Sequence, residues 1–195
     1  MALASADIIS TLRLTLRSPR QAARVVMGWP LALGERWAIL AVMAVASTLS
    51  ATVFVTLAPE SADPAMTMIL ANPVVFAAMQ FGGLAVMSGL IFAVGRRFGG
   101  IGSFSEVLAI VGWIQVILFT LQLAQVVALI LLPPLAVLIG LASLALSLWL
   151  LPCFIAELHG FRSAIATFFG MIATFIVAAV VLAVMIALVF GPLGA

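Results

Sequence analysis

The sequence predicts an all-α integral membrane protein with a bundle of five transmembrane helices, and three observations support this fold class. Of its 195 residues, 66% are hydrophobic and only 7% are charged, whereas soluble domains are about 45–50% apolar and about 25% charged. Long stretches of the chain carry no charged side chain at all. The arginines that interrupt these stretches follow a one-sided pattern.

The uncharged stretches define the expected spans. A transmembrane helix needs about 20 apolar residues, so the long stretch that starts at residue 107 must cross twice. Pro133 and Pro134 mark its turn, because adjacent prolines remove backbone donors and stop the incoming helix. Runs without period-two alternation exclude a membrane barrel. One membrane domain over residues 37–195 is therefore expected, with spans at residues 37–57, 74–95, 107–132, 135–156 and 164–190.

The arginines predict the orientation, because positively charged loops are retained on the cytoplasmic side of a membrane. Five of them precede the first span, two follow the second and one follows the fourth: Arg13, Arg17, Arg20, Arg24, Arg36, Arg96, Arg97 and Arg162. The other side receives the acidic loop with Glu60 and Asp63, the proline turn and the uncharged tail. We therefore expect a cytoplasmic amino terminus and a periplasmic or exoplasmic carboxyl terminus.

Residues 1–36 are expected to form a cytoplasmic amphipathic segment at the membrane interface. At ~100° per residue, four arginines would form one stripe of a single helix, with apolar side chains beside it: Arg13, Arg17, Arg20 and Arg24. Ser18 and Pro19 are typical of an N-cap and a first helical residue, which favours two short helices. One interpretation is that this segment binds anionic lipid or a protein partner. The favoured interpretation is that it lies in the plane of the membrane only as part of the topology, without a binding role.

A glycine-rich turn follows the second span. Arg96 and Arg97 open it, and Ser103 with Glu106 forms a capping box that starts the next helix. Glycine-rich loops can bind phosphate, but this one lacks a Gly-Lys-Ser/Thr ending. A structural turn is the favoured interpretation.

A second polar turn precedes the last span and contains Glu157, His159 and Arg162. Gly160 is expected to end one helix and Ser163 to open the next. The favoured interpretation is a solvated turn, and the alternative is a group that responds to pH or binds a partner.

Within the spans, Gln115, Gln122 and Gln125 lie on one side of the third helix, where glutamines usually join helices by hydrogen bonds. Small residues, among them Gly82, Gly89 and Gly140, form stripes that are expected to let helices pack closely. No span holds an ionisable residue near its middle, which counts against a pump or an ion-coupled transporter.

The inventory of reactive side chains predicts no enzyme. One histidine, one cysteine and six acids cannot supply a catalytic triad, a dimetal centre or a conventional zinc site. We expect no cofactor, no metal site and no nucleic-acid partner. The absence of lysine and tyrosine suggests a GC-rich bacterial genome, and hence a multi-pass protein of a bacterial inner (plasma) membrane.

Two sequence motifs carry a resemblance to a known family. The turn Phe98-Gly99-Gly100-Ile101-Gly102-Ser103-Phe104 and the turn Ala156-Glu157-Leu158-His159-Gly160-Phe161-Arg162-Ser163, together with five spans, resemble a bacterial member of the Yip-one family over nearly the whole chain. The resemblance implies a five-span membrane fold. Eukaryotic members interact with Rab GTPases in vesicle traffic. This sequence lacks their long soluble amino-terminal region and tyrosine-containing loop, so the resemblance implies the fold more than the partner.

These observations lead to one functional hypothesis and two alternatives. The first is a non-enzymatic interaction or scaffold protein that contacts membrane lipids and an unidentified protein partner through its cytoplasmic turns and arginines. An accessory subunit, packed into a larger membrane complex by its small-residue stripes, is the second. A small permease or channel, with the glutamine face lining a path, is the third.

Overall fold

The computed structural model describes residues 5–58 and 64–191, and every regular element within these ranges is a helix. Five helices are long and apolar enough to cross a membrane, which confirms the predicted fold class. They are α3 (Leu33–Leu57), α5 (Pro73–Arg97), α6 (Phe104–Leu131), α7 (Pro133–His159) and α8 (Ala164–Phe190). The shorter helices are α1 (Ser5–Arg17), α2 (Pro19–Met27) and α4 (Pro64–Leu70).

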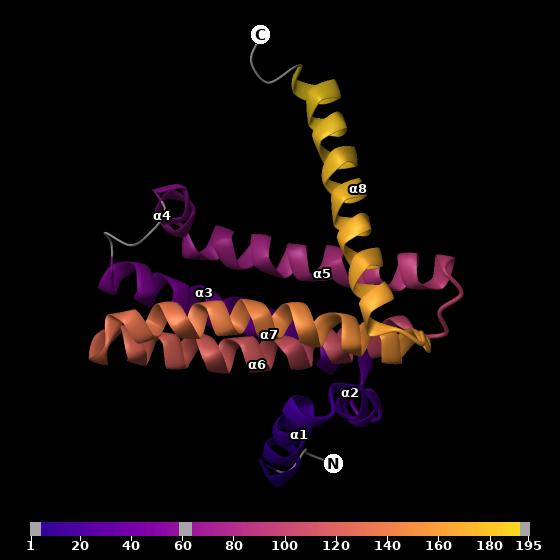
Figure 1. The fold of residues 1–195 in the computed structure, drawn as a ribbon. Helices are drawn as coiled ribbons and strands as arrows, with labels where there is room; N and C mark the ends of the chain where they lie inside the picture. Colours follow the sequence, from indigo (N-terminus) through magenta and orange to yellow (C-terminus); the bar gives the residue numbers. More distant parts are fainter. Residues whose placement is uncertain (1–4, 59–63, 192–195) are drawn as a thin grey trace.

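Four of the long helices, α3, α5, α6 and α7, run side by side (Figure 1). Helix α6 is central, because it contacts α2, α3, α5 and α7. It also carries an unbroken buried run from Val107 to Ile114. Helix α8 instead leaves the bundle (Figure 1), and it packs mainly on α7. No residue in its most apolar window is buried inside the protein.

The first span begins four residues earlier than expected, at Leu33 rather than residue 37. The backbone N–H of Ala32 donates to Glu35 Oε2 at 2.6 Å, and this side chain satisfies one donor at the helix start. Arg36 is consequently a helical residue and not part of a loop. Uncharged runs locate the apolar middle of a helix, whereas caps and backbone bonds set its ends.

The proline pair also lies differently from the expectation. Helix α6 ends at Leu131 and α7 begins at Pro133, so Leu132 alone connects them. The sequence pattern predicts the prolines in a turn, with the next helix starting at residue 135. They instead occupy the first turn of that helix, where a backbone N–H has no helical partner and its loss costs little.

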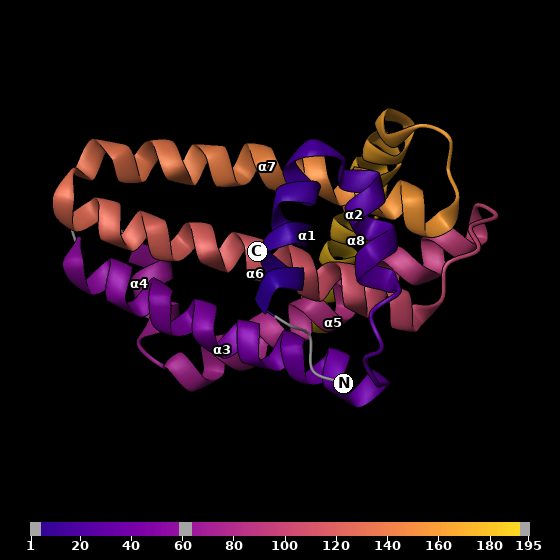
Figure 2. The same cartoon turned by 90° about the horizontal axis from the view of Figure 1, so that it is seen from below.

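The predicted break in the amino-terminal segment is confirmed: Ser18 separates α1 from α2, although its hydroxyl makes no capping bond. The break prevents the four arginines from forming one continuous stripe. Helix α2 lies against α6 and α7 (Figure 2). Its residues Ala22, Ala23 and Val26 are completely buried. The segment is therefore an integral part of the packed fold.

A tryptophan of the bundle holds this segment in place. Trp113 of α6 donates from its indole Nε1 to Thr15 Oγ1 at 3.0 Å. Trp29, just after α2, packs edge-on against the same indole, with ring centroids 5.2 Å apart. Tryptophan needs a hydrogen-bond acceptor when it is buried, and the amino-terminal segment provides one. No sequence pattern predicts this docking, because it depends on contacts between residues about a hundred positions apart.

Six arginines gather where α3 and α6 begin and α5 and α7 end; we call this the arginine end, defined by Arg20, Arg24, Arg36, Arg96, Arg97 and Arg162. Arg13 and Arg17 lie on the adjoining α1. The Leu132 connection and α4 lie at the opposite end of the bundle (Figure 1). Glu60 and Asp63 lie outside the described residues. Which side of the membrane the arginine end faces stays a prediction.

Candidate functional site

Three of the predicted contact residues come together at the arginine end. Glu157, near the end of α7, forms ion pairs with two arginines of α2: its oxygens lie 3.2 Å from Arg24 Nε and 3.8 Å from Arg20 Nε. Arg20 Nη2 also donates to the carbonyl of Phe161. The amino-terminal segment is thus connected to the turn between α7 and α8.

Glu157→Gln is expected to loosen α2, because a neutral amide keeps the shape of glutamate but loses the charge that attracts both arginines. The pair is partly exposed, so we expect a loss of about 1 kcal/mol. Cys153 is buried and lies four residues before Glu157, on the same face of α7. A maleimide should therefore modify Cys153 faster in this variant.

Glu106→Gln is the matched control for that change. It removes the same charge, but glutamine preserves a capping box with Ser103, so the modification rate should stay at the wild-type value. Equal rates in Glu157→Gln and wild type would show that the ion pairs do not hold α2.

His159 is not in a solvated turn, contrary to the favoured sequence interpretation. Its side chain is only 2% exposed, and Nε2 lies 3.1 Å from the carbonyl oxygen of Ile91 in α5. Since a carbonyl can only accept, Nε2 carries the hydrogen. Gly160, at φ 72°, ends α7 as predicted.

The end of α5 and the glycine-rich turn that follows it together form the slot that holds this imidazole. A Cβ added at Gly95 or Gly100 would overlap the ring of His159, and one at Gly102 would lie 2.6 Å from Leu158 Cγ. These glycines thus provide space for the end of α7, which supports the structural interpretation of the turn. The predicted capping box is confirmed: Glu106 Oε2 accepts from Ser103 N at 2.7 Å.

Most of the arginines of the protein are exposed at its surface. Five arginines are exposed and form no ion pair with any described residue: Arg13, Arg17, Arg96, Arg97 and Arg162. Phe98 and Ile101, which follow Arg96 and Arg97 in the chain, are each 76% exposed. We call Arg96, Arg97, Phe98, Ile101 and Arg162 the basic rim.

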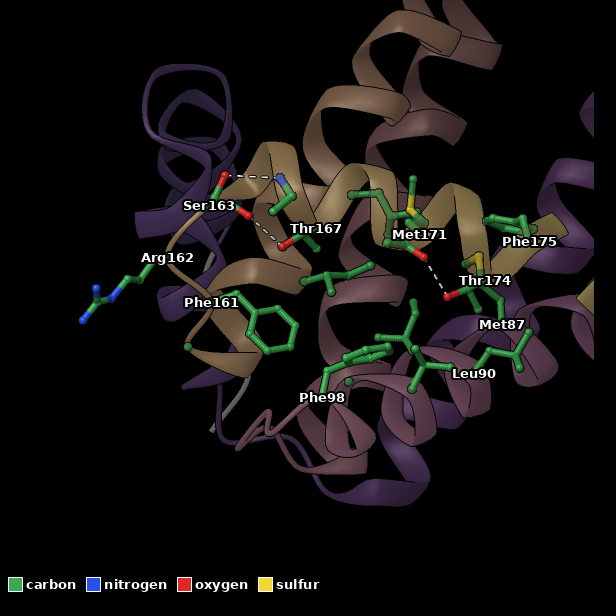
Figure 3. A pocket seen from close by; sticks show the side chains of 18 residues that line it. Met87, Leu90, Phe98, Phe161, Arg162, Ser163, Thr167, Met171, Thr174 and Phe175 are labelled. Atoms are coloured by element: carbon green, nitrogen blue, oxygen red, sulfur yellow. Dashed lines mark hydrogen bonds between the residues drawn. The ribbon is translucent and has the colours of Figure 1, made fainter. Parts of the chain in front are cut away.

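A groove of about 660 Å³ opens beside the basic rim, between α5, α7 and α8. Its walls are mainly apolar, with Met87 and Leu90 on α5 and Met171 and Phe175 on α8 (Figure 3). Hydroxyls in the wall are satisfied by their own helix, as where Thr174 Oγ1 donates to Gly170 O at 2.8 Å. The groove therefore offers an apolar surface with few free polar groups.

The phenyl rings of Phe98 and Phe161 lie at the end of this groove, whereas the guanidinium of Arg162 points away from it (Figure 3). The aromatic lining thus belongs to the groove, and the charge of Arg162 belongs to the surface beside it. Apolar and basic groups are adjacent but separate.

The predicted glutamine face lines a second cavity, of about 610 Å³, between α3, α5, α6 and α7. Gln115, Gln122 and Gln125 all reach it, and Gln80 of α5 joins them. Gln122 Nε2 donates to the carbonyl of Ser47 at 3.2 Å and so joins α6 to α3. Sequence reasoning missed Gln80, although its position as the lone glutamine of its span was a usable signal.

The predicted close helix packing at the small-residue stripes occurs on α7 but not on α5. At Gly140 an added Cβ would lie 3.0 Å from Gln125 Nε2, so α7 approaches α6 closely there. At Gly82 and Gly89 no atom of the described residues lies within 4 Å of such a Cβ, so the expected close approach is absent. Helix α5 instead buries Leu84, Ser88 and Gly95, on a different face.

Comparison with known proteins identifies the family. A family model, the Yip1 domain, matches residues 13–186. The chain belongs to the Yip1 domain family. No curated protein and no solved structure matched it. The Yip1 match begins near the end of α1 and runs through most of α8, so the arginine end and both cavities lie within the family domain. Membership of the Yip-one family, which the two turns suggested, is confirmed.

Proposed function

We propose that this chain is a non-enzymatic interaction protein of the membrane, which binds a protein partner through the groove and the basic rim. The observation that carries the proposal is that an apolar groove between three helices adjoins exposed arginines that form no ion pair within the described ranges. In this proposal the arginine end faces the cytoplasm, because positively charged segments are retained there.

Charge complementarity specifies the partner. The acids near the arginine end are already engaged: Glu35 and Glu106 accept from backbone N–H groups, and Glu157 pairs with two arginines. The cations of the basic rim are therefore available to groups outside this chain. A partner with an apolar membrane helix followed by an acidic segment fits both surfaces.

The composition of the site favours a protein over lipid alone. Protein interfaces are enriched in aromatic residues, methionine and arginine, and this site combines Phe98, Phe161 and Met171 with the arginines of the basic rim. Anionic lipids would neutralise the arginines equally well, but they do not require a groove bounded by three helices. Lipid is therefore the competing outcome of the test.

Gly170→Phe tests the proposal by filling the groove. Gly170 lines the groove, and a Cβ added to it would meet no atom of the described residues within 4 Å, so the new ring enters free space without disturbing the fold. Affinity isolation from gently solubilised membranes should recover a reproducible partner with the wild type, and at least about tenfold less with this variant.

Gly83→Phe is the matched control. Gly83 is a helical glycine of α5, an added Cβ there would likewise meet nothing within 4 Å among the described residues, and it lies outside the groove. Its partner recovery should equal that of the wild type. Wild-type protein that carries only anionic lipid, or a partner that Gly170→Phe retains in full, would refute the proposal.

A further inference from the structure

The second cavity gathers nearly all of the glutamine side chains that the chain carries. The sequence contains five glutamines, and four of them, Gln80, Gln115, Gln122 and Gln125, line this one cavity. The fifth, Gln21, is exposed on α2. In a chain this apolar, such a concentration within the membrane-spanning bundle gives an otherwise mainly apolar cavity a cluster of amide groups.

Hydrogen bonds within the protein use only some of the donors and acceptors of these glutamine side chains. Gln122 is bonded to Ser47 O, whereas Gln115 and Gln125 form no hydrogen bond with any described residue. Amide groups that lack partners in an apolar medium cost several kcal/mol by transfer measurements. A polar occupant would satisfy them.

Gln80 has spare capacity as well. Thr48 Oγ1 lies 2.8 Å from Ala44 O and 3.3 Å from Gln80 Oε1. A hydroxyl carries one hydrogen, and the shorter contact to Ala44 takes it. The amide of Gln80 therefore keeps hydrogen-bonding groups for a ligand.

The lining also indicates which chemistry the occupant has. Among the described residues, no charged side chain lines the cavity, so a charged ligand would lose its hydration without gaining a counter-charge. Phe54, Phe76 and Phe119 form the aromatic part of the wall. We propose that this cavity binds an uncharged amphiphile, with a hydroxyl-bearing head group on the glutamines and a hydrocarbon part against the phenyl rings.

This inference does not rest on the proposed function. The two cavities share no lining residue in the part of the chain that the structure describes. The glutamine cavity is bounded in part by Leu70 of α4, and so it extends toward the end of the bundle opposite the arginine end. A volume of about 610 Å³ lies within the ~300–1,000 Å³ range of small-molecule sites.

The test uses radiolabelled monooleoylglycerol as the neutral probe, with the purified full chain in lipid nanodiscs. Binding should be saturable, and oleate, which has the same hydrocarbon chain with a carboxylate, should bind at least about tenfold more weakly. Absence of saturable monooleoylglycerol binding, or equal binding of oleate, would overturn the proposal.

The variant that probes the site is Gln115→Leu combined with Gln125→Leu, because these two amides make no hydrogen bond to the described residues whose loss could unfold the protein. It should bind monooleoylglycerol at least about tenfold more weakly, while Gln21→Leu should bind it like the wild type. Protection of the buried Cys153 from maleimide verifies folding. Wild-type affinity in a folded double variant would overturn the proposal.

Discussion

Gly95→Ala is expected to destabilise the protein by about 3 kcal/mol, because it overpacks a site that has no room for a methyl group. The new Cβ would overlap the imidazole of His159. That ring is almost fully buried, and Gly100 also packs against it, so the ring has little room to move away. The contact between His159 Nε2 and Ile91 O would also be lost.

The measurement is thermal unfolding in detergent. The readout is the chemical modification of Cys153, because this thiol is buried in the folded state and reacts only when the protein unfolds. Gly89→Ala is the control on the same helix, because no atom of the described residues lies within 4 Å of its added Cβ. Alanine also favours a helix over glycine by about 1 kcal/mol, so this control should be as stable as the wild type or more so.

A double variant separates the clash from other effects of the substitution. Combining Gly95→Ala with His159→Ala removes the ring that the methyl group meets, so the two changes should be coupled rather than additive. The double variant should be no less stable than His159→Ala alone. If the losses of stability in the two single variants simply add, or if Gly95→Ala melts like the wild type, then Gly95 and His159 do not meet in the way the slot requires.

Arg36→Met is expected to cost about 3 kcal/mol, because it removes three hydrogen bonds from a charged group to backbone carbonyls, and such bonds contribute about 1.5–3 kcal/mol when they are well formed. The Arg36 side chain is only 6% exposed. Its guanidinium donates to the carbonyls of Ser105, Trp29 and Leu31 at 2.7, 3.1 and 3.2 Å. It thereby ties the start of α6 to the linker between α2 and α3.

Arg36→Lys distinguishes geometry from charge. Lysine keeps the charge but lacks the planar fork that reaches several acceptors at once, so its stability should lie between those of Arg36→Met and wild type. Arg97→Met is the control, because Arg97 is exposed and forms no ion pair with the described residues; it should change stability by less than about 0.5 kcal/mol. An Arg36→Met variant that melts like the control would disprove the network.

Arg36 also shows the limit of reading charge from sequence. In the sequence, Arg36 is one of eight arginines, and it contributes only to the prediction of which side of the membrane the arginine-bearing segments face. The three carbonyls that accept its hydrogen bonds come from two segments that are far apart in the chain, and no local sequence pattern predicts these bonds. His159 is a similar case, because its burial depends on glycines some sixty residues earlier.

The candidate site could be predicted only in part, because the contacts that form it also join segments that are distant in the sequence. Glu157, Arg20 and Arg24 each stand out in the sequence as charged residues near an interface, but their pairing follows from the docking of α2 on α7. The groove depends on where α8 leaves the bundle. The glutamine cavity is visible in the sequence only as one face of α6, and the packing of α5 brings Gln80 to it.

The sequence by itself determined the five apolar helices, their caps at Ser103 and Ser163 and the one-sided arginines, because lipid imposes these features locally: each helix satisfies its own backbone, and charges are kept out of the spans. The tertiary structure alone decided which helix faces meet, that α2 is docked and that α8 departs. Lipid is as apolar as leucine, so hydrophobicity does not specify these contacts, and close packing between distant residues does.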